Sequence, residues 1–90
     1  MNEILIDDIM DISLQAGVLV LENGGETYRA EETCVHIARA MGAGNASAFV
    51  TPTVVIVTVT DQNKKSHTAM QRITNRSVNL EKISKINNLA

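Results

Sequence analysis

The chain has 90 residues, a formal net charge of −2 and 44% hydrophobic residues, a composition typical of one small globular domain. A net negative charge gives no electrostatic reason to bind nucleic acid. The only aromatic residues are Tyr28 and Phe49, too few to stack several bases, so we expect no nucleic-acid partner. Cys34 is the single cysteine, which excludes an internal disulfide and a site built from several thiolates.

The first twelve residues mix acidic and apolar side chains, unlike a secretory signal. No stretch approaches the ~20 apolar residues that span a bilayer. We therefore expect the 90 residues to be soluble, and the lone Cys34 indicates a reducing compartment.

A helix is predicted over residues 4–21, because apolar residues recur there at three- and four-residue steps. The apolar face is wide enough for this helix to be packed nearly all round. It contains Leu5, Ile9, Ile12, Ala16, Leu19 and Val20, with Met10, Leu14, Val18 and Leu21 beside them. Asn23, Gly24 and Gly25 favour the left-handed conformations that end a helix, and Asn23 also stands where it could cap the next one.

A second, narrower helix is predicted over residues 26–41, and the "GAG" at 42–44 ends it. Its apolar stripe consists of Ala30, Cys34, Ile37, Ala38 and Met41. Cys34 therefore lies on the apolar side, where a small buried hydrophobic residue is more common than a reactive thiolate.

The composition then changes to Val, Ile and Thr, which favour strands over 46–51 and 53–60, with Pro52 at a bend, bulge or boundary between them. In the second strand Val55, Val57 and Val59 share one face, and the other face is mixed. Residues 61–66 form a polar turn, after which 67–73 pair back as a hairpin.

A last helix is predicted from residue 79, with Leu80, Ile83, Ile86 and Leu89 at helical spacing. It reaches Ala90 without a stop signal, so we expect a truncated helix and a fragment of a longer protein. The predicted fold is a single α+β domain over residues 1–90, ααβββα. A small antiparallel three-stranded sheet carries the helices on one face.

Three stretches carry a family resemblance: "LENGGETYRAEET" at 21–33, "FVTPTVVIVTV" at 49–59 after "ARAMG", and "RI" followed by "NLEKI" at 79–83. They resemble the N-terminal domain of the threonine/serine exporter family, over about residues 9–89. Gly25 and Ala30 stand where alanine and valine are common in that family. The resemblance implies a soluble cytoplasmic domain followed by transmembrane helices, in a parent protein of the cell membrane that exports small amino acids or, in related two-component systems, a small dicarboxylate.

Glu26, Thr27 and Arg29 follow the glycine break and could form a ligand site. An arginine can grip a carboxylate through two hydrogen bonds, and a glutamate can accept an ammonium group. An alternative is helix capping, in which Glu26 favours the helix start, Thr27 satisfies free amides and Glu26 pairs with Arg29. Thr51 and Thr53 could add hydroxyls to the site or serve only as strand residues.

Arg72, on the third predicted strand, is a weaker addition to this set. A catalytic triad would have to combine His36 or His67 with a serine or Cys34, but no nucleophile elbow surrounds any serine. The two histidines also lack metal-ligand spacing, and "GAGNAS" at 42–47 is only a fragment of a phosphate-loop pattern. We therefore predict no metal and no cofactor.

Three hypotheses of function follow. The first is a cytoplasmic domain of a membrane exporter that acts in ligand sensing, gating or assembly, with a small amino acid or dicarboxylate and the transmembrane part of the same parent protein as partners. The second is a hydrolase-like enzyme in which Glu26 is the base and Arg29 stabilises negative charge. The third is a purely structural domain that forms homo-oligomers.

Overall fold

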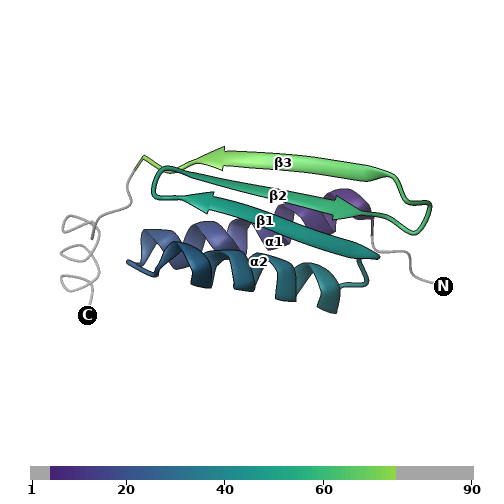
Figure 1. Ribbon diagram of the computed structural model, residues 1–90, viewed down its shortest axis with the longest axis horizontal. Coiled ribbons are helices and arrows are strands. Elements are labelled where there is room, and N and C mark those ends of the chain that lie inside the picture. Colours follow the sequence, from purple (N-terminus) through teal and green to yellow (C-terminus); the bar gives the residue numbers. More distant parts are fainter. Residues whose placement is uncertain (1–4, 75–90) are drawn as a thin grey trace, which may run out of the picture.

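The computed structural model describes residues 5–74, and within them two helices precede three strands (Figure 1). The elements are α1 (Ile6–Glu22), α2 (Thr27–Ala40), β1 (Asn45–Thr51), β2 (Val54–Thr60) and β3 (Ser66–Arg72). Each begins and ends within two residues of its predicted bounds. The helix predicted from residue 79 lies outside the described residues.

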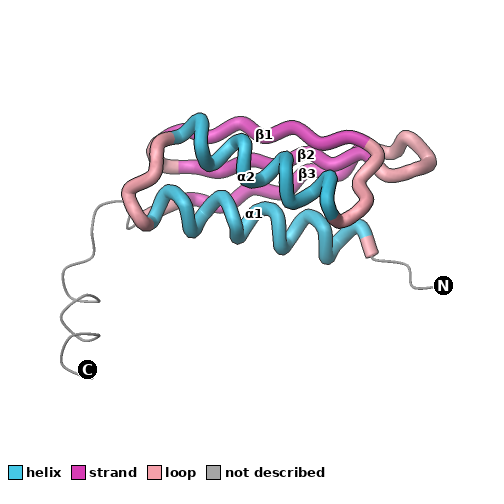
Figure 2. The backbone as a smooth tube through the Cα atoms, turned by 90° about the horizontal axis from the view of Figure 1, so that it is seen from below, coloured by secondary structure: helices cyan, strands magenta, loops and turns pink. Residues whose placement is uncertain are grey.

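The three strands form an antiparallel sheet in the order β1-β2-β3, and both helices cover the same face of it (Figures 1 and 2). α1 packs on β2 and β3, whereas α2 packs mainly on β1. The predicted two-layer α+β fold is confirmed for the described residues. Pro52 lies in the tight turn between β1 and β2, so the predicted strand boundary is also confirmed.

The alternation along β2 separates the two faces of the sheet as predicted. Val55, Val57 and Val59 are completely buried against the helices. The register places Phe49, Ile56 and Met70 side by side on the other face, which no helix among residues 5–74 covers. One face of the sheet thus belongs to the core, and the other remains open in this part of the chain.

The prediction that α1 is packed nearly all round is wrong. Leu5, Ile12 and Leu19 are exposed, at 62%, 48% and 58% of their surface. The buried face runs instead through small residues, Ser13 and Gly17. The other buried residues of α1 are Ile9, Met10, Leu14, Val18 and Leu21. The physical reason is that small side chains let α2 and the sheet approach this face of the helix closely.

Both helices end in the same hydrogen-bonded motif. After α1 the Gly25 N–H donates to Val20 O and the Gly24 N–H to Leu21 O, the pattern of a Schellman motif. Of the three residues expected to be left-handed there, only Gly24 has a positive φ, of 83°. Gly42 plays the same part after α2, with a φ of 103°. Gly24 therefore turns the chain sharply enough for α2 to return along α1, and Gly42 turns it from α2 into β1.

Candidate functional site

The structure gathers most of the predicted site residues at one end of the molecule. The α1–α2 loop, the β1–β2 turn and the end of β3 all lie at this end, on the left in Figures 1 and 2. The first of these segments leads into Glu26, Thr27 and Arg29, and the second contains Thr51 and Thr53. Residues about 25 positions apart in the sequence therefore share one polar end.

Glu26 occupies the N-cap position of α2, but no side chain caps this helix end. Glu26 and Arg29 are both exposed, and no ion pair joins them within residues 5–74. Asn23 does not cap α2, contrary to the prediction. Its amide nitrogen donates to Leu19 O at 2.7 Å and thus supports the end of α1. The polar side chains at the start of α2 are therefore not used for capping.

The β1–β2 turn uses the Thr51 hydroxyl for its own structure. Thr51 Oγ1 accepts hydrogen bonds from the backbone N–H groups of Thr53, at 3.2 Å, and Val54, at 3.1 Å. Thr53 is exposed. Arg72 pairs with Val54 across β2 and β3, on the face of the sheet opposite the helices. The structure thus separates Arg72 from Glu26 and Arg29 by the thickness of the sheet.

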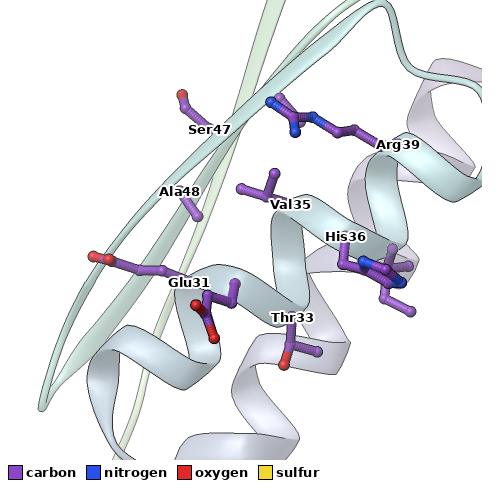
Figure 3. Close-up of a pocket in the computed structure, with 10 residues that line it drawn as sticks. Glu31, Thr33, Val35, His36, Arg39, Ser47 and Ala48 are labelled. Atoms are coloured by element: carbon purple, nitrogen blue, oxygen red, sulfur yellow. The ribbon is translucent and has the colours of Figure 1, made fainter.

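The sequence analysis missed an open groove of about 820 Å³ between α2 and the edge of β1 (Figure 3). Its polar lining includes Glu31, Glu32, His36 and Arg39 of α2. β1 contributes Ala46, Ser47 and Ala48. None of the six predicted site residues lines it. The sequence does show the polar face of the second helix. Only the fold shows that this face lies beside the edge of β1 and so lines a groove.

Two side chains accept hydrogen bonds from backbone N–H groups along this edge of β1. Glu31 Oε2 accepts from the Val50 N–H at 3.0 Å, and Asn45 Oδ1 accepts from the Ala46 N–H at 2.9 Å. Ala48 lies midway between them, and strand alternation points its N–H to the same side. Satisfied edge groups discourage pairing with another strand, so Glu31 and Asn45 each protect one of the outward N–H groups of this edge.

The residues considered for nucleophilic catalysis do not come together. Cys34 is completely buried, and burial raises the pKa of its thiol to about 11, so the small buried hydrophobic residue predicted there is confirmed. Ser66 and His67 are neighbours in β3 and therefore point to opposite faces of the sheet. Within residues 5–74 no group of three His, Cys, Asp or Glu side chains is arranged to hold a metal ion.

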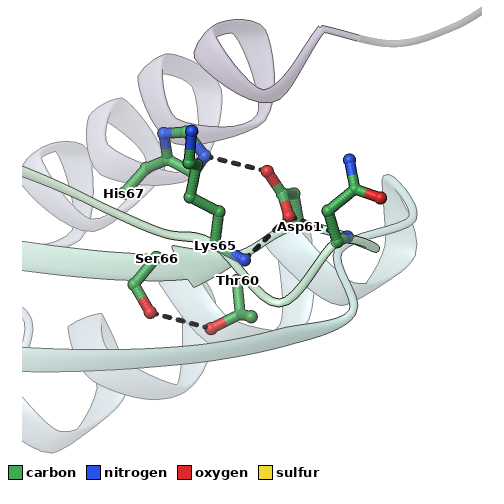
Figure 4. Close-up of polar contacts among 6 residues, drawn as sticks. Thr60, Asp61, Lys65, Ser66 and His67 are labelled. Atoms are coloured by element: carbon green, nitrogen blue, oxygen red, sulfur yellow. Dashed lines mark hydrogen bonds and ion pairs between the residues drawn. The ribbon is translucent and has the colours of Figure 1, made fainter.

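The β2–β3 turn is organised by Asp61 (Figure 4). Its Oδ1 accepts from the backbone N–H groups of Asn63 and Lys65 at 2.8 and 2.9 Å, and its Oδ2 lies 3.1 Å from Nε2 of His67. The hydrogen bond from Lys65, followed by that from His67, lowers the pKa of Asp61 below its ordinary value of 3.8. These contacts fix a turn, and the exposed Lys64 and Lys65 form its tip as expected.

These features define a two-layer α+β domain with a polar cluster at one end and a groove along one strand edge. A family model described as "Putative threonine/serine exporter" matches residues 11–90. The chain therefore belongs to this threonine/serine exporter family, as the resemblance implied, and is an exporter-related domain. Searches of curated proteins and of solved structures gave no match. No helix within residues 5–74 is both long and apolar enough to cross a membrane.

Proposed function

We propose that the chain is the cytoplasmic N-terminal domain of an integral-membrane exporter of threonine, serine or a similar small amino acid or dicarboxylate, and that it senses this solute. The observation that carries the proposal is the family match over residues 11–90. Solute sensing adds a role for the polar end of the domain. Gating or assembly of the exporter would be the consequence of binding there.

The spacing of charges favours the polar end over the groove as the solute site. Glu26 and Arg29 are three residues apart at the start of α2, which corresponds to ~4.5 Å along a helix. That distance suits the neighbouring ammonium and carboxylate groups of an amino acid. In the groove, Glu32 and Arg39 are seven residues apart, or ~10 Å, so one small amino acid would not reach both. The free N–H groups at the start of α2 add a second attraction for a carboxylate.

The test is an NMR titration of the 90-residue chain with serine, threonine, other small amino acids and short dicarboxylates. We expect saturable shifts of the amides around Glu26 and Arg29, extending to the β1–β2 turn. Arg29→Ala should abolish these shifts while the rest of the spectrum stays that of a folded domain.

Arg39→Ala is the matched control, because it removes the same charge from the same helix but from the groove. It should leave the titration unchanged. A flat response up to millimolar solute would contradict sensing by this domain. Saturable shifts that Arg39→Ala abolishes and Arg29→Ala does not would move the site to the groove.

A further inference from the structure

The two edge strands of the sheet, β1 and β3, differ in protection. On β1, Glu31 and Asn45 accept outward N–H groups, and α2 packs mainly on this strand. If β1 paired with β1 of a second copy of the chain, the two α2 helices would lie only ~5 Å apart, whereas packed helices need about 8–10 Å. The β1 edge is therefore closed to a second copy.

The outer edge of β3 has no such protection within residues 5–74. The Ile73 N–H donates to Thr53 O at 2.7 Å just beyond the strand, so by alternation the odd-numbered residues of β3 bond to β2. The even-numbered residues point their N–H and C=O groups outward, and no described group bonds to them: Ser66, Thr68, Met70 and Arg72. The strand also lacks a proline or a bulge, two devices that keep an edge from pairing.

This edge is complementary to a second copy of itself. Two β3 strands can run antiparallel about a two-fold axis that passes beside Ala69. Thr68 then lies opposite Met70 of the second copy, and Ser66 lies opposite its Arg72. Each of these pairs exchanges two hydrogen bonds, so every outward group of β3 finds a partner.

The helices leave room for this pairing. α1 packs on both β2 and β3, so its axis lies ~2.4 Å inside β3. Across a pair of β3 strands the two α1 helices would therefore lie ~10 Å apart. This separation is normal for packed helices, so β3 admits a second copy where β1 does not.

The side of α1 that would face the second copy carries exposed apolar residues. Gln15 Nε2 donates to Gln71 Oε1 of β3 at 2.7 Å, whereas Gly17 faces α2 on the opposite side of the helix. At about 100° per residue, Ile12 and Leu19 lie within about 60° of Gln15. Both are exposed in the single chain, and pairing through β3 brings them toward the other α1.

Two features make this association weak. Asp8, Asp11 and Glu22 lie on the same side of α1 as Gln15, so they would repel the acidic residues of the other copy. The contact measures roughly 23 Å by 20 Å in cross-section, or ~460 Å², which places it at the small end of protein interfaces. We therefore expect a dimer that forms at high micromolar concentration and is strengthened by salt, which screens the repulsion.

We infer that two copies of this chain associate through the outer edges of β3 into a two-fold dimer with one continuous sheet. The exposed rows of Phe49, Ile56 and Met70 on the open faces then meet, because Met70 becomes a diagonal neighbour of its own copy. This inference is independent of solute binding at the polar end, so either can fail without the other.

Cross-linking beside the axis tests the geometry. Ala69 would lie opposite its own copy with ~4.5 Å between the Cα atoms, which suits a disulfide. In the 90-residue chain under mild oxidation, Ala69→Cys should give a linked dimer at least about tenfold faster than Ala48→Cys. Ala48 is the matched control, because it is also a half-buried alanine on the helix side of an edge strand. Cys34 is completely buried and takes no part.

Sedimentation measures the association without a cross-link. Thr68→Lys adds a charge at the edge, diagonal to its own copy, and should weaken the dimer at least about tenfold. Thr58→Lys is the matched control and should keep the dimer. Both variants lose the same 2.9 Å contact between the Thr58 and Thr68 hydroxyls and add a lysine to the same face, but Thr58 lies on the central strand.

A chain that stays monomeric up to ~1 mM, at high salt as well, would overturn the inference. Equal cross-linking rates of Ala69→Cys and Ala48→Cys would also overturn it. A dimer that both lysine variants weaken equally would place the contact on the open face instead. Slow hydrogen exchange of the Thr68 and Met70 amides in the monomer, unchanged by dilution, would show that another segment of the same chain covers the edge and would equally overturn it.

Discussion

Gly17 is the residue through which α1 comes close to α2 and the sheet. A Cβ atom at this position would overlap Cys34 Sγ and would lie 3.3 Å from Val55 Cγ1, both in completely buried side chains. The small residue and the buried thiol therefore form one packing unit. This explains why a glycine occurs in the middle of a helix, where it is normally unfavourable.

We predict that Gly17→Ala lowers the free energy of unfolding by ~1–3 kcal/mol, because the added methyl group overpacks the contact with Cys34. The gain in helix propensity from Gly to Ala, up to ~1 kcal/mol, offsets only part of this loss. Urea unfolding followed by circular dichroism measures the difference.

Cys34→Ala provides the control, because it removes the Sγ atom that the new methyl group would overlap. The Gly17→Ala substitution should cost less in that background, with a coupling energy of ~0.5–3 kcal/mol between the two positions. Strictly additive effects would show that the clash with Cys34 is not the cause.

Among the elements, β1 is an edge strand of the sheet, and Glu31 of α2 protects part of its outer edge. The Glu31 carboxylate accepts the Val50 N–H at 3.0 Å, so a helix side chain replaces the missing neighbouring strand. This glutamate lies in the "YRAEET" stretch that carries the family resemblance. A residue in a recognisable motif thus has a structural role in this fold.

We predict that Glu31→Ala lowers the free energy of unfolding by about 0.5–1.5 kcal/mol, since the Val50 N–H loses its acceptor. Hydrogen exchange of the Val50 amide should become faster. Exchange of the Val55 and Val57 amides, at the centre of the sheet, should accelerate only as much as the lower free energy of global unfolding requires. Glu31→Gln keeps an acceptor oxygen and should restore slow exchange. An exchange rate of the Val50 amide that is the same in Glu31→Ala as in the native chain, after correction for global stability, would mean that the carboxylate does not protect this amide.

At the scale of the whole molecule, the elements could be predicted because their signals are local. Alternation of Val55, Val57 and Val59 with more polar neighbours follows from the two-residue period of a strand. The buried face of α1 could not be read in the same way, because Ser13 and Gly17 are small rather than apolar. Their burial depends on how closely another helix approaches, which hydrophobic periodicity does not report.

The candidate site was predictable only in part, because its geometry depends on contacts between elements and not on local sequence patterns. Sequence chemistry offered Glu26 and Arg29 as candidates, and the fold places the β1–β2 turn at the same end as these two residues. The use of the Thr51 hydroxyl within its own turn and the position of Arg72 on the opposite face depend on the strand register. The groove beside β1 depends on the packing of α2 over an edge strand, so no single segment of the sequence indicates it.

The stability of the whole domain should fall in acid partly through Asp61. Its pKa is lowered in the folded state, chiefly by the hydrogen bond from the Lys65 N–H and then by that from His67. A carboxylate of this kind stabilises the fold fully above its unfolded pKa, near 3.8, and the contribution is lost as the pH falls through the lower folded value.

We therefore predict that Asp61→Asn lowers the urea midpoint at neutral pH and makes its decline below about pH 4 shallower than in the native chain. Asp11→Asn is the matched control, because it removes the same charge from an exposed position on α1. Unfolding curves from about pH 7 to pH 2.5 measure both effects. If Asp61→Asn shifted the midpoint equally at every pH, the turn would depend on the shape of this side chain and not on its charge.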